Sequence, residues 1–287
     1  MKVLEVDGIK KNFGKKKVLK GIDFELNESM ITALVGPNGS GKSTLLNIIS
    51  NLLTPDSGKV RIYDIVNTNT KIYEKFSYMI DNTVLYPYLT GLDHLKFISD
   101  VHGLPKDRIE ECSEILGITG FSNQKVKEYS LGMKQQLLFT MTLLPDHNLL
   151  LLDEPFNGLD PTTIIKVREV ITDLRNIGKT ILLSSHNLAE IDQLTSDILF
   201  LKDGKVLREN ISDYQRRRYE IRVETNGNPI ELPRDEFQME GNKIIFELGK
   251  LNLQEAIDRI SKKYEITDIQ RQIVGSEERY KELFGRS

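Results

Sequence analysis

The chain carries, at residues 31–44, the run Ile31-Thr32-Ala33-Leu34-Val35 followed directly by Gly36-Pro37-Asn38-Gly39-Ser40-Gly41-Lys42-Ser43-Thr44. The apolar, β-branched run predicts a buried strand, and the glycines predict a tight loop at its end. The loop fits the spacing of a phosphate-binding loop between a strand and a helix, which is Gly, four residues, then Gly-Lys-Ser/Thr. In such a loop the backbone N–H groups hold phosphates, Lys42 reaches the β- and γ-phosphates, and the Ser43 hydroxyl ligates Mg²⁺. An ordinary glycine-rich loop is the alternative, and the predicted strand and helix on either side argue against it.

A second element with chemical content lies at residues 149–154, where four leucines precede Asp153 and Glu154. A buried strand that ends in Asp can hold the hydration shell of Mg²⁺, and the following Glu is placed to polarise the attacking water. Taken alone, the pattern fits equally well a strand followed by the acidic first turn of a helix. Its position after a phosphate-binding loop favours the catalytic interpretation.

Alternation of strands and helices predicts an α/β fold with a largely parallel sheet that is covered on both faces. Near the N-terminus, alternating stretches at 3–6 and 18–26 predict antiparallel strands around the turn Asn12-Phe13-Gly14-Lys15. Further strands are predicted at 76–80, 149–153, 180–184 and 198–201, and helices at 43–50, 90–101, 106–116, 130–144 and 161–176. The segment 90–129 is predicted to be almost entirely helical, so that residues 90–144 form a helical insertion in the core.

Composition excludes several classes of protein. The 287 residues contain 39 Lys and Arg against 42 Asp and Glu, a net charge of −3, so no overall basic field supports binding to nucleic acid. The lone Cys112 can form neither an intrachain disulfide nor a thiolate metal site, which fits a reducing cytosol. Charges within residues 1–7 and short apolar runs elsewhere predict neither a signal peptide nor a membrane-spanning helix. Any contact with a membrane is therefore expected through a partner.

A change in composition near residue 212 predicts a boundary between a domain over 1–211 and a smaller α+β domain over 212–287. In the smaller domain we expect strands at 219–224 and 266–273, a hairpin around 240–243, an amphipathic helix at 251–263 and a short helix that ends at 284. The run Arg216-Arg217-Arg218 at its start is interpreted as a solvated linker, with contact to anionic lipid as the alternative.

Residues 2–210 resemble the ATP-binding subunits of ABC transporters, because further motifs follow in the order typical of that family. Tyr129-Ser130-Leu131-Gly132-Met133-Lys134-Gln135-Gln136 looks like the signature motif, Asn157-Gly158-Leu159-Asp160 like the loop that contacts the second subunit, and Ser184-Ser185-His186 like the switch histidine. Phe13 occupies the place of the aromatic residue that stacks on adenine. The resemblance implies a P-loop ABC ATPase core with an antiparallel N-terminal subdomain and a helical subdomain, followed by the accessory α+β domain.

The resemblance also implies a role for each motif residue. Glu154 is expected to be the general base, Lys42 and His186 to contact the γ-phosphate, and Ser43 and Asp153 to hold Mg²⁺. The residues expected to contact ATP are Phe13, Gly36, Pro37, Asn38, Gly39, Ser40, Gly41, Lys42, Ser43 and Thr44, joined by Ser130, Gly132 and Asp160 of the second subunit. Taken singly, Ser130 could be a plain helix N-cap, His186 a surface histidine and Phe13 a packed turn residue.

The sequence departs from the family pattern at two positions. The signature has Leu131-Gly132 where the family usually has two glycines, a variant associated with exporters. Asp81 stands where the family usually has a glutamine, which keeps an oxygen ligand for Mg²⁺ but adds a negative charge beside Asp153 and Glu154. Asp81 is therefore a further candidate metal ligand, and the alternative is that it faces water or the partner subunit.

By resemblance, the chain is expected to hydrolyse ATP as one of two ATPase subunits, in a homodimer or heterodimer, and to drive a separate integral-membrane permease. It would then be cytoplasmic, held at the inner face of the cell membrane through the permease, with no nucleic acid as partner. The signature variant, Asp81 and the short tail favour export of peptides, antibiotics or sodium. The alternative is a soluble ABC ATPase of translation or DNA repair, which usually carries two cassettes, a long coiled coil or cysteine-rich zinc modules. A non-hydrolysing regulatory module is disfavoured by Glu154 and His186.

Overall fold

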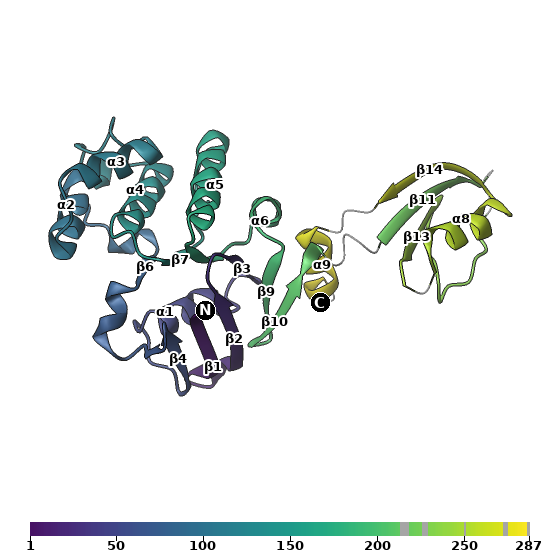
Figure 1. The fold of residues 1–287 in the computed structure, drawn as a ribbon, viewed down its shortest axis with the longest axis horizontal. Coiled ribbons are helices and arrows are strands. Elements are labelled where there is room, and N and C mark those ends of the chain that lie inside the picture. Colours follow the sequence, from purple (N-terminus) through teal and green to yellow (C-terminus); the bar gives the residue numbers. More distant parts are fainter. Residues whose placement is uncertain (213–217, 226–228, 250, 272–274, 286–287) are drawn as a thin grey trace. The chain divides into compact units, whose positions relative to one another are not determined.

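The computed structural model describes residues 1–287 apart from 213–217, 226–228, 250, 272–274 and 286–287 (Figure 1). The chain forms two compact units, Met1–Glu209 and Asn210–Ser287. Each unit has a hydrophobic core of its own, which includes Leu34 and Leu151 in the first unit and Phe246 in the second. The division lies close to residue 212, where the composition changes.

The first unit begins with an antiparallel sheet of strand order β2-β1-β4-β5. Its strands are β1 (Lys2–Phe13), β2 (Lys16–Asn27), β4 (Ser57–Ile62) and β5 (Ile65–Val66). β1 and β2 pair across the turn that joins Phe13 to Lys16, as their alternating pattern predicts. β4 and β5 have no counterpart among the predicted strands, because only Val60 and Ile62 of β4 are buried and so short an alternation resembles a loop.

The second sheet of this unit has the strand order β10-β9-β3-β8-β7-β6. Its strands are β3 (Ile31–Val35), β6 (Phe76–Met79), β7 (Leu149–Asp153), β8 (Thr180–Ser184), β9 (Asp197–Lys202) and β10 (Lys205–Asn210). β3 pairs in parallel with β8 and β9, and β7 pairs in parallel with β6 and β8. The carboxyl ends of β3, β7 and β8 therefore lie along one edge, which is where open parallel sheets bind ligands.

Helices follow the strands of this sheet and also form a group of their own. α1 (Lys42–Ile49), α5 (Pro161–Asn176) and α6 (Leu188–Leu194) come after β3, β7 and β8 in the chain. α2 (Gly91–His102), α3 (Asp107–Leu116) and α4 (Leu131–Leu143) pack on one another in the helical subdomain (Figure 1). The short 3₁₀ helices are η1 (Thr70–Glu74), η2 (Asn82–Val84) and η3 (Val126–Glu128). Within the described part of the chain, no helix has the length and apolar character needed to cross a bilayer.

The prediction of nearly continuous helix over 90–129 is wrong after Leu116. Gly103 and Gly117 adopt left-handed conformations, with φ of 61° and 70°, at the C-termini of α2 and α3, and they end both helices. Residues 117–130 then form turns and η3 before α4 begins. The apolar residues Ile118 and Val126 of this segment are buried without belonging to an α-helix. Apolar spacing alone cannot separate this arrangement from a helix.

The second unit is an antiparallel sheet of strand order β12-β13-β11-β14, with α8 packed on one face. Its elements are β11 (Arg218–Glu224), β12 (Gln238–Glu240), β13 (Lys243–Glu247), α8 (Leu253–Ser261), β14 (Glu265–Arg271) and α9 (Ser276–Phe284). A capping box formed by Asn252 and Glu255 begins α8. Of the arginine run interpreted as a linker, Arg216 and Arg217 lie outside the described residues, and Arg218 is the first residue of β11.

We expect the chain cut after residue 211 to fold and to bind nucleotide, because the two hydrophobic cores share no residue. Thermal unfolding of the truncated chain should be a single cooperative transition, and a fluorescence titration should give a nucleotide affinity close to that of the full chain. A truncated chain that is soluble and folded but binds no nucleotide would show that the second unit contributes to the nucleotide site.

Candidate nucleotide-binding and hydrolysis site

Residues 36–41 form a tight loop between β3 and α1 that depends on glycine at two positions. A Cβ at Gly36 would lie 2.7 Å from the carbonyl oxygen of Leu201, and a Cβ at Gly41 would lie 2.8 Å from Cγ1 of Val18. Gly41 also has a φ of 110°, which residues with side chains rarely adopt. α1 begins directly after this loop without a side-chain N-cap, so its first backbone N–H groups can bind an anion.

The Lys42 ammonium lies within this loop, and the side chain is only 7% exposed. Its Nζ donates to the carbonyl oxygen of Gly36 at 2.8 Å and of Pro37 at 3.5 Å, and lies 3.7 Å from Oε1 of Glu154. A buried ammonium needs acceptors or a counter-charge, and these groups supply both. The phosphates of a nucleotide would be stronger partners for the same charge.

The surroundings of the Ser40 side chain indicate whether the loop can hold a phosphate ligand. Its Oγ is buried and has no hydrogen-bond partner among the described residues. A buried hydroxyl without a partner costs roughly 1–3 kcal/mol, and a phosphate oxygen bound in the loop would accept its proton. Ser43 is exposed and Thr44 half-buried at the start of α1, next to this position. The loop therefore fits a phosphate ligand.

Asp153 ends β7 and Glu154 follows it, and both bond to Ser184 at the end of the neighbouring strand β8. Ser184 Oγ donates to Asp153 Oδ1 at 2.5 Å and accepts from the backbone N–H of Glu154 at 3.0 Å. Glu154 has a φ of 51°, the left-handed conformation that favours glycine. The chain therefore turns sharply after Asp153, and strain of this kind concentrates at functional sites.

The carboxylate of Glu154 joins Lys42 and His186 into one cluster. Its Oε2 accepts from the backbone N–H of His186 at 3.2 Å and lies 2.8 Å from Nδ1 of the imidazole, while its Oε1 faces Lys42. A neutral imidazole donates in this contact only with its proton on Nδ1. The His186 side chain is 59% exposed, so the ring is free to turn toward a ligand. All three predicted catalytic residues are thus brought together.

Ser130, Gly132 and Asp160 lie at the starts of α4 and α5. Ser130 caps α4 by accepting from the N–H of Met133 at 3.2 Å, and Asp160 caps α5 by accepting from the N–H groups of Thr162 and Thr163. The hydrogen bonds from Thr163 and Thr162 hold the pKa of Asp160 below its usual range. Ser130 and Asp160 thus act as the N-caps of α4 and α5.

Phe13 lies at the β1–β2 turn with 51% of its surface exposed, and Lys11 Nζ lies 5.7 Å from the centroid of its ring. An exposed aromatic face at this turn can stack on a base. The Lys11 ammonium already makes a cation–π contact with the ring, at a distance typical of such pairs.

Asp81 caps η2, and its Oδ1 accepts from the backbone N–H of Thr83 at 2.8 Å and from the Thr83 hydroxyl. The side chain is exposed. Burial, followed by the charges of Asp153 and Asp81, raises the pKa of Tyr78, so both carboxylates lie near this phenol. Asp81 is therefore on the loop next to the site, with its carboxylate bonded to that same loop.

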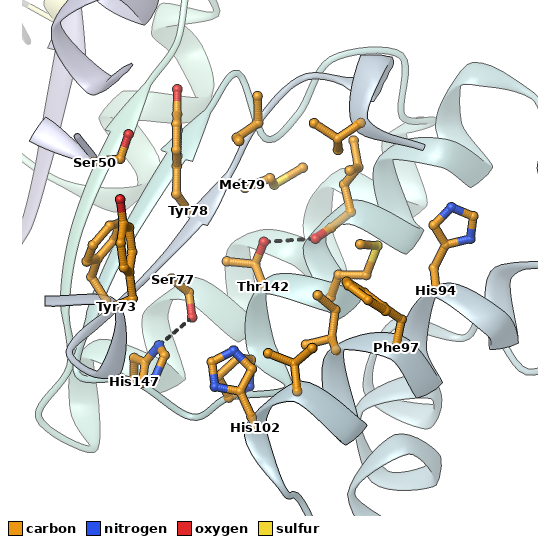
Figure 2. A pocket seen from close by; sticks show the side chains of 18 of the residues that line it. Ser50, Tyr73, Ser77, Tyr78, Met79, His94, Phe97, His102, Thr142 and His147 are labelled. Atoms are coloured by element: carbon orange, nitrogen blue, oxygen red, sulfur yellow. Dashed lines mark hydrogen bonds between the residues drawn. The ribbon is translucent and has the colours of Figure 1, made fainter. Parts of the chain in front are cut away.

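A pocket of about 610 Å³ lies between β6 and the helices α2 and α4 (Figure 2). Its walls are mostly apolar and include Phe97 and Met141. On one side, Ser77 Oγ lies 3.1 Å from Nδ1 of His147, and burial lowers the pKa of this histidine. Phe97 is 66% exposed and Tyr86 is 67% exposed at the rim. An apolar hollow with an exposed aromatic rim is suited to an apolar segment of a partner.

The pocket was not predicted from the sequence, and neither were the contacts that two polar residues, Ser184 and Gln135, make in the site. Ser184 forms part of the quoted switch motif, but its bonds to Asp153 and Glu154 join positions about 30 residues away. Gln135 Nε2 donates to the carbonyl oxygen of Glu154 at 2.7 Å. In the sequence Gln135 is one of three consecutive polar residues, Lys134, Gln135 and Gln136, so nothing local distinguished it from its neighbours.

Comparison with known proteins gives relatives over most of the chain. A family model described as "ABC transporter" matches residues 19–157. The Bacillus subtilis ABC transporter ATP-binding protein YdbJ is 34% identical over 263 residues, covering 88% of this chain and 85% of that protein. The lantibiotic transport ATP-binding protein SrtF of Streptococcus pyogenes is 34% identical over 74% of this chain and 92% of its own length. The bacitracin transport ATP-binding protein BcrA of Enterococcus faecalis is 33% identical, covering 75% of this chain and 71% of that protein.

Solved structures agree with these matches. A dimeric ATP-binding cassette in a post-hydrolysis state, bound to ADP and Pi, superposes with a TM-score of 0.66 at 28% identity and covers 72% of this chain and 98% of that one. The relatives are transporter subunits, which argues against an ATPase of translation or DNA repair. With a phosphate loop, a buried lysine and a carboxylate cluster in the places that such a cassette requires, the chain belongs to the ABC transporter family as an ATP-hydrolysing, ATP-binding subunit that powers a membrane transporter.

Proposed function

We propose that this subunit powers export of an antimicrobial peptide or antibiotic through a separate permease at the inner face of the cell membrane. The cargo class is supported by the names of two relatives, a lantibiotic transport and a bacitracin transport ATP-binding protein. The observation that carries the catalytic part is the cluster of Lys42, Glu154 and His186 at the carboxyl ends of parallel strands.

ATP binds with its phosphates in the loop 36–41. Lys42 exchanges the loop carbonyls for the β- and γ-phosphates, and the Ser40 hydroxyl gains an acceptor. Phe13 stacks on the adenine. Ser43 and Asp153 would hold Mg²⁺, which would offset the charge of the phosphate oxygens. One or two carboxylates are sufficient for this ion because the phosphates provide further ligands.

Glu154 acts as the general base for the attacking water. Its carboxylate is preorganised by the backbone N–H of His186 and by the left-handed turn that projects it beside Lys42. When Lys42 binds phosphate, Oε1 of Glu154 loses its cationic neighbour and can accept the proton of the water. His186, on the exposed side, then contacts the γ-phosphate.

A second ATPase subunit completes each site. Ser130, Gly132 and Asp160 lie at helix starts, where free N–H groups and cap oxygens can face the nucleotide of the opposite copy. Two ATP molecules are thus held between two copies, and hydrolysis releases the pair.

The permease docks in the pocket between β6 and α2. Residues on both sides of Asp81, Ile80 and Val84, line this pocket, and β6 pairs with β7, which ends at Asp153. Movement of a docked segment is therefore transmitted to the metal-binding end of β7 through one pair of strands. Membrane contact occurs through the permease alone.

Glu154→Gln is expected to abolish most hydrolysis while ATP binding persists, because a general base acts in the transition state and is worth about 10²- to 10⁴-fold. Turnover measured by phosphate release should fall by that factor, and sizing chromatography with ATP and Mg²⁺ should show a dimer. If the variant turns over ATP at nearly the parental rate and elutes only as a monomer, Glu154 is not the general base.

Asp81→Gln is expected to shift the Mg²⁺ concentration that gives half-maximal ATPase activity, because it removes one charge near Asp153 and keeps an oxygen ligand. Asp81→Ala should in addition impair transport more than ATPase activity, since its loop borders the pocket. Unchanged Mg²⁺ titrations for both variants, with transport intact, would show that Asp81 is neither a metal ligand nor a coupling residue.

Phe97→Ser is expected to weaken co-purification of the permease, because it removes an exposed aromatic side chain from the rim of the pocket. ATPase activity of the isolated subunit should stay near that of the parent. Ile177→Ser, a change at a residue that is 72% exposed after α5, is the matched control and should retain the permease. Equal loss of the permease in both variants would contradict docking at this pocket.

A further inference from the structure

We propose that Gln135 is a positioning residue for hydrolysis, which holds the backbone of Glu154 in its left-handed turn and ties the general base to α4. The proposal rests on the role of Glu154 proposed above, and it adds a residue that does not touch the nucleotide. Through this hydrogen bond, Gln135 connects the signature residues to the general base of the same chain.

The contact itself is short and enclosed. Gln135 is 7% exposed, and its Nε2 donates to the carbonyl oxygen of Glu154 at 2.7 Å. A carbonyl oxygen can only accept, so chemistry fixes which end of the amide faces it. The same oxygen accepts from the backbone N–H of Asn157 at 3.1 Å. Both of its acceptor sites are thus filled, and the peptide plane after Glu154 is fixed in orientation.

This peptide needs such support because Glu154 occupies a conformation that residues with side chains avoid. A non-glycine residue at a φ of 51° is strained and persists only where its surroundings hold it. Here the N–H of Glu154 is held by Ser184, and its carbonyl oxygen is held by Gln135. The direction of the side chain follows from the backbone dihedrals. Loss of either support would therefore let the carboxylate leave its place beside Lys42 and His186.

Two further contacts join the start of α4 to the loop after Glu154. A Cβ at Gly132 would lie 2.9 Å from the carbonyl oxygen of Gly158, and a Cβ at Gly158 would lie 2.5 Å from the Leu131 side chain. The signature residues and residues 154–158 are therefore packed as one body with Gln135 as its polar connection. In the proposed dimer, the signature faces the nucleotide of the other copy, so this body links each base to the opposite ATP.

The neighbouring residue provides a matched control. Gln136 Nε2 also donates to a backbone carbonyl oxygen, that of Leu116 at the end of α3, at 3.0 Å. The two glutamines thus share a helix, a donor group and a kind of acceptor, and they differ in whether the bond reaches the catalytic loop.

The test compares Gln135→Leu, Gln135→Glu and Gln136→Leu in the full chain, with ATP titration, steady-state ATPase activity and circular dichroism. Gln135→Leu should lower kcat by about tenfold or more, the scale expected for a displaced catalytic group, with ATP affinity within about twofold of the parent. In Gln135→Glu the carboxyl can donate only when protonated. The ratio of its activity to that of the parent should therefore rise as the pH falls, which a purely structural role would not produce. Gln136→Leu should keep kcat within about twofold.

A double-mutant cycle with Glu154→Gln completes the test. If Gln135 acts through Glu154, adding Gln135→Leu to Glu154→Gln should lower the residual turnover no further. Equal losses in Gln135→Leu and Gln136→Leu, or additive losses in the cycle, would overturn the proposal. If Glu154→Gln itself keeps parental turnover, the role of the base fails instead, so the two failures can be told apart.

Discussion

The buried ammonium of Lys42 is the constraint on which the remainder of the site depends. A cation that is 7% exposed must be surrounded by acceptors, and the chain provides the carbonyls of Gly36 and Pro37 and the carboxylate of Glu154. These groups reach it because β3 and β7, both next to β8 in the sheet, end at the same edge. The order of strands thus determines which residues meet, and the glycines of the loop determine how closely.

The same edge explains why two strands supply most of the chemistry. β7 ends in two carboxylates, and β8 ends in Ser184, whose hydroxyl bonds to Asp153 and to the backbone of Glu154. His186, two residues later, returns to the carboxylate of Glu154. The ends of two adjacent strands thereby fix Asp153, Glu154 and His186 relative to one another. Gln135 adds a support for Glu154 from the helical subdomain.

The sequence predicted those parts of the fold in which the signal is local. Residues 31–44 identify a strand, a loop and a helix within a short window, and the four leucines before Asp153 identify a buried strand. Segments with weak local signals were missed, such as β4, with two buried residues, and the irregular segment that follows Gly117. The bonds of Ser184 and Gln135 to Glu154 could not be predicted from one sequence, because they depend on which strands and helices become neighbours. Asp81 was identified from its position in the motif, but its bond to Thr83 emerges only in the structure.

The hydroxyl of Ser40, which has no hydrogen-bond partner among the described residues, and the left-handed Glu154 both lie at the candidate nucleotide site. Both raise the free energy of the chain without nucleotide, and a ligand that gives Ser40 an acceptor removes one of these costs. Occupancy by nucleotide therefore adds to folding stability as well as to turnover.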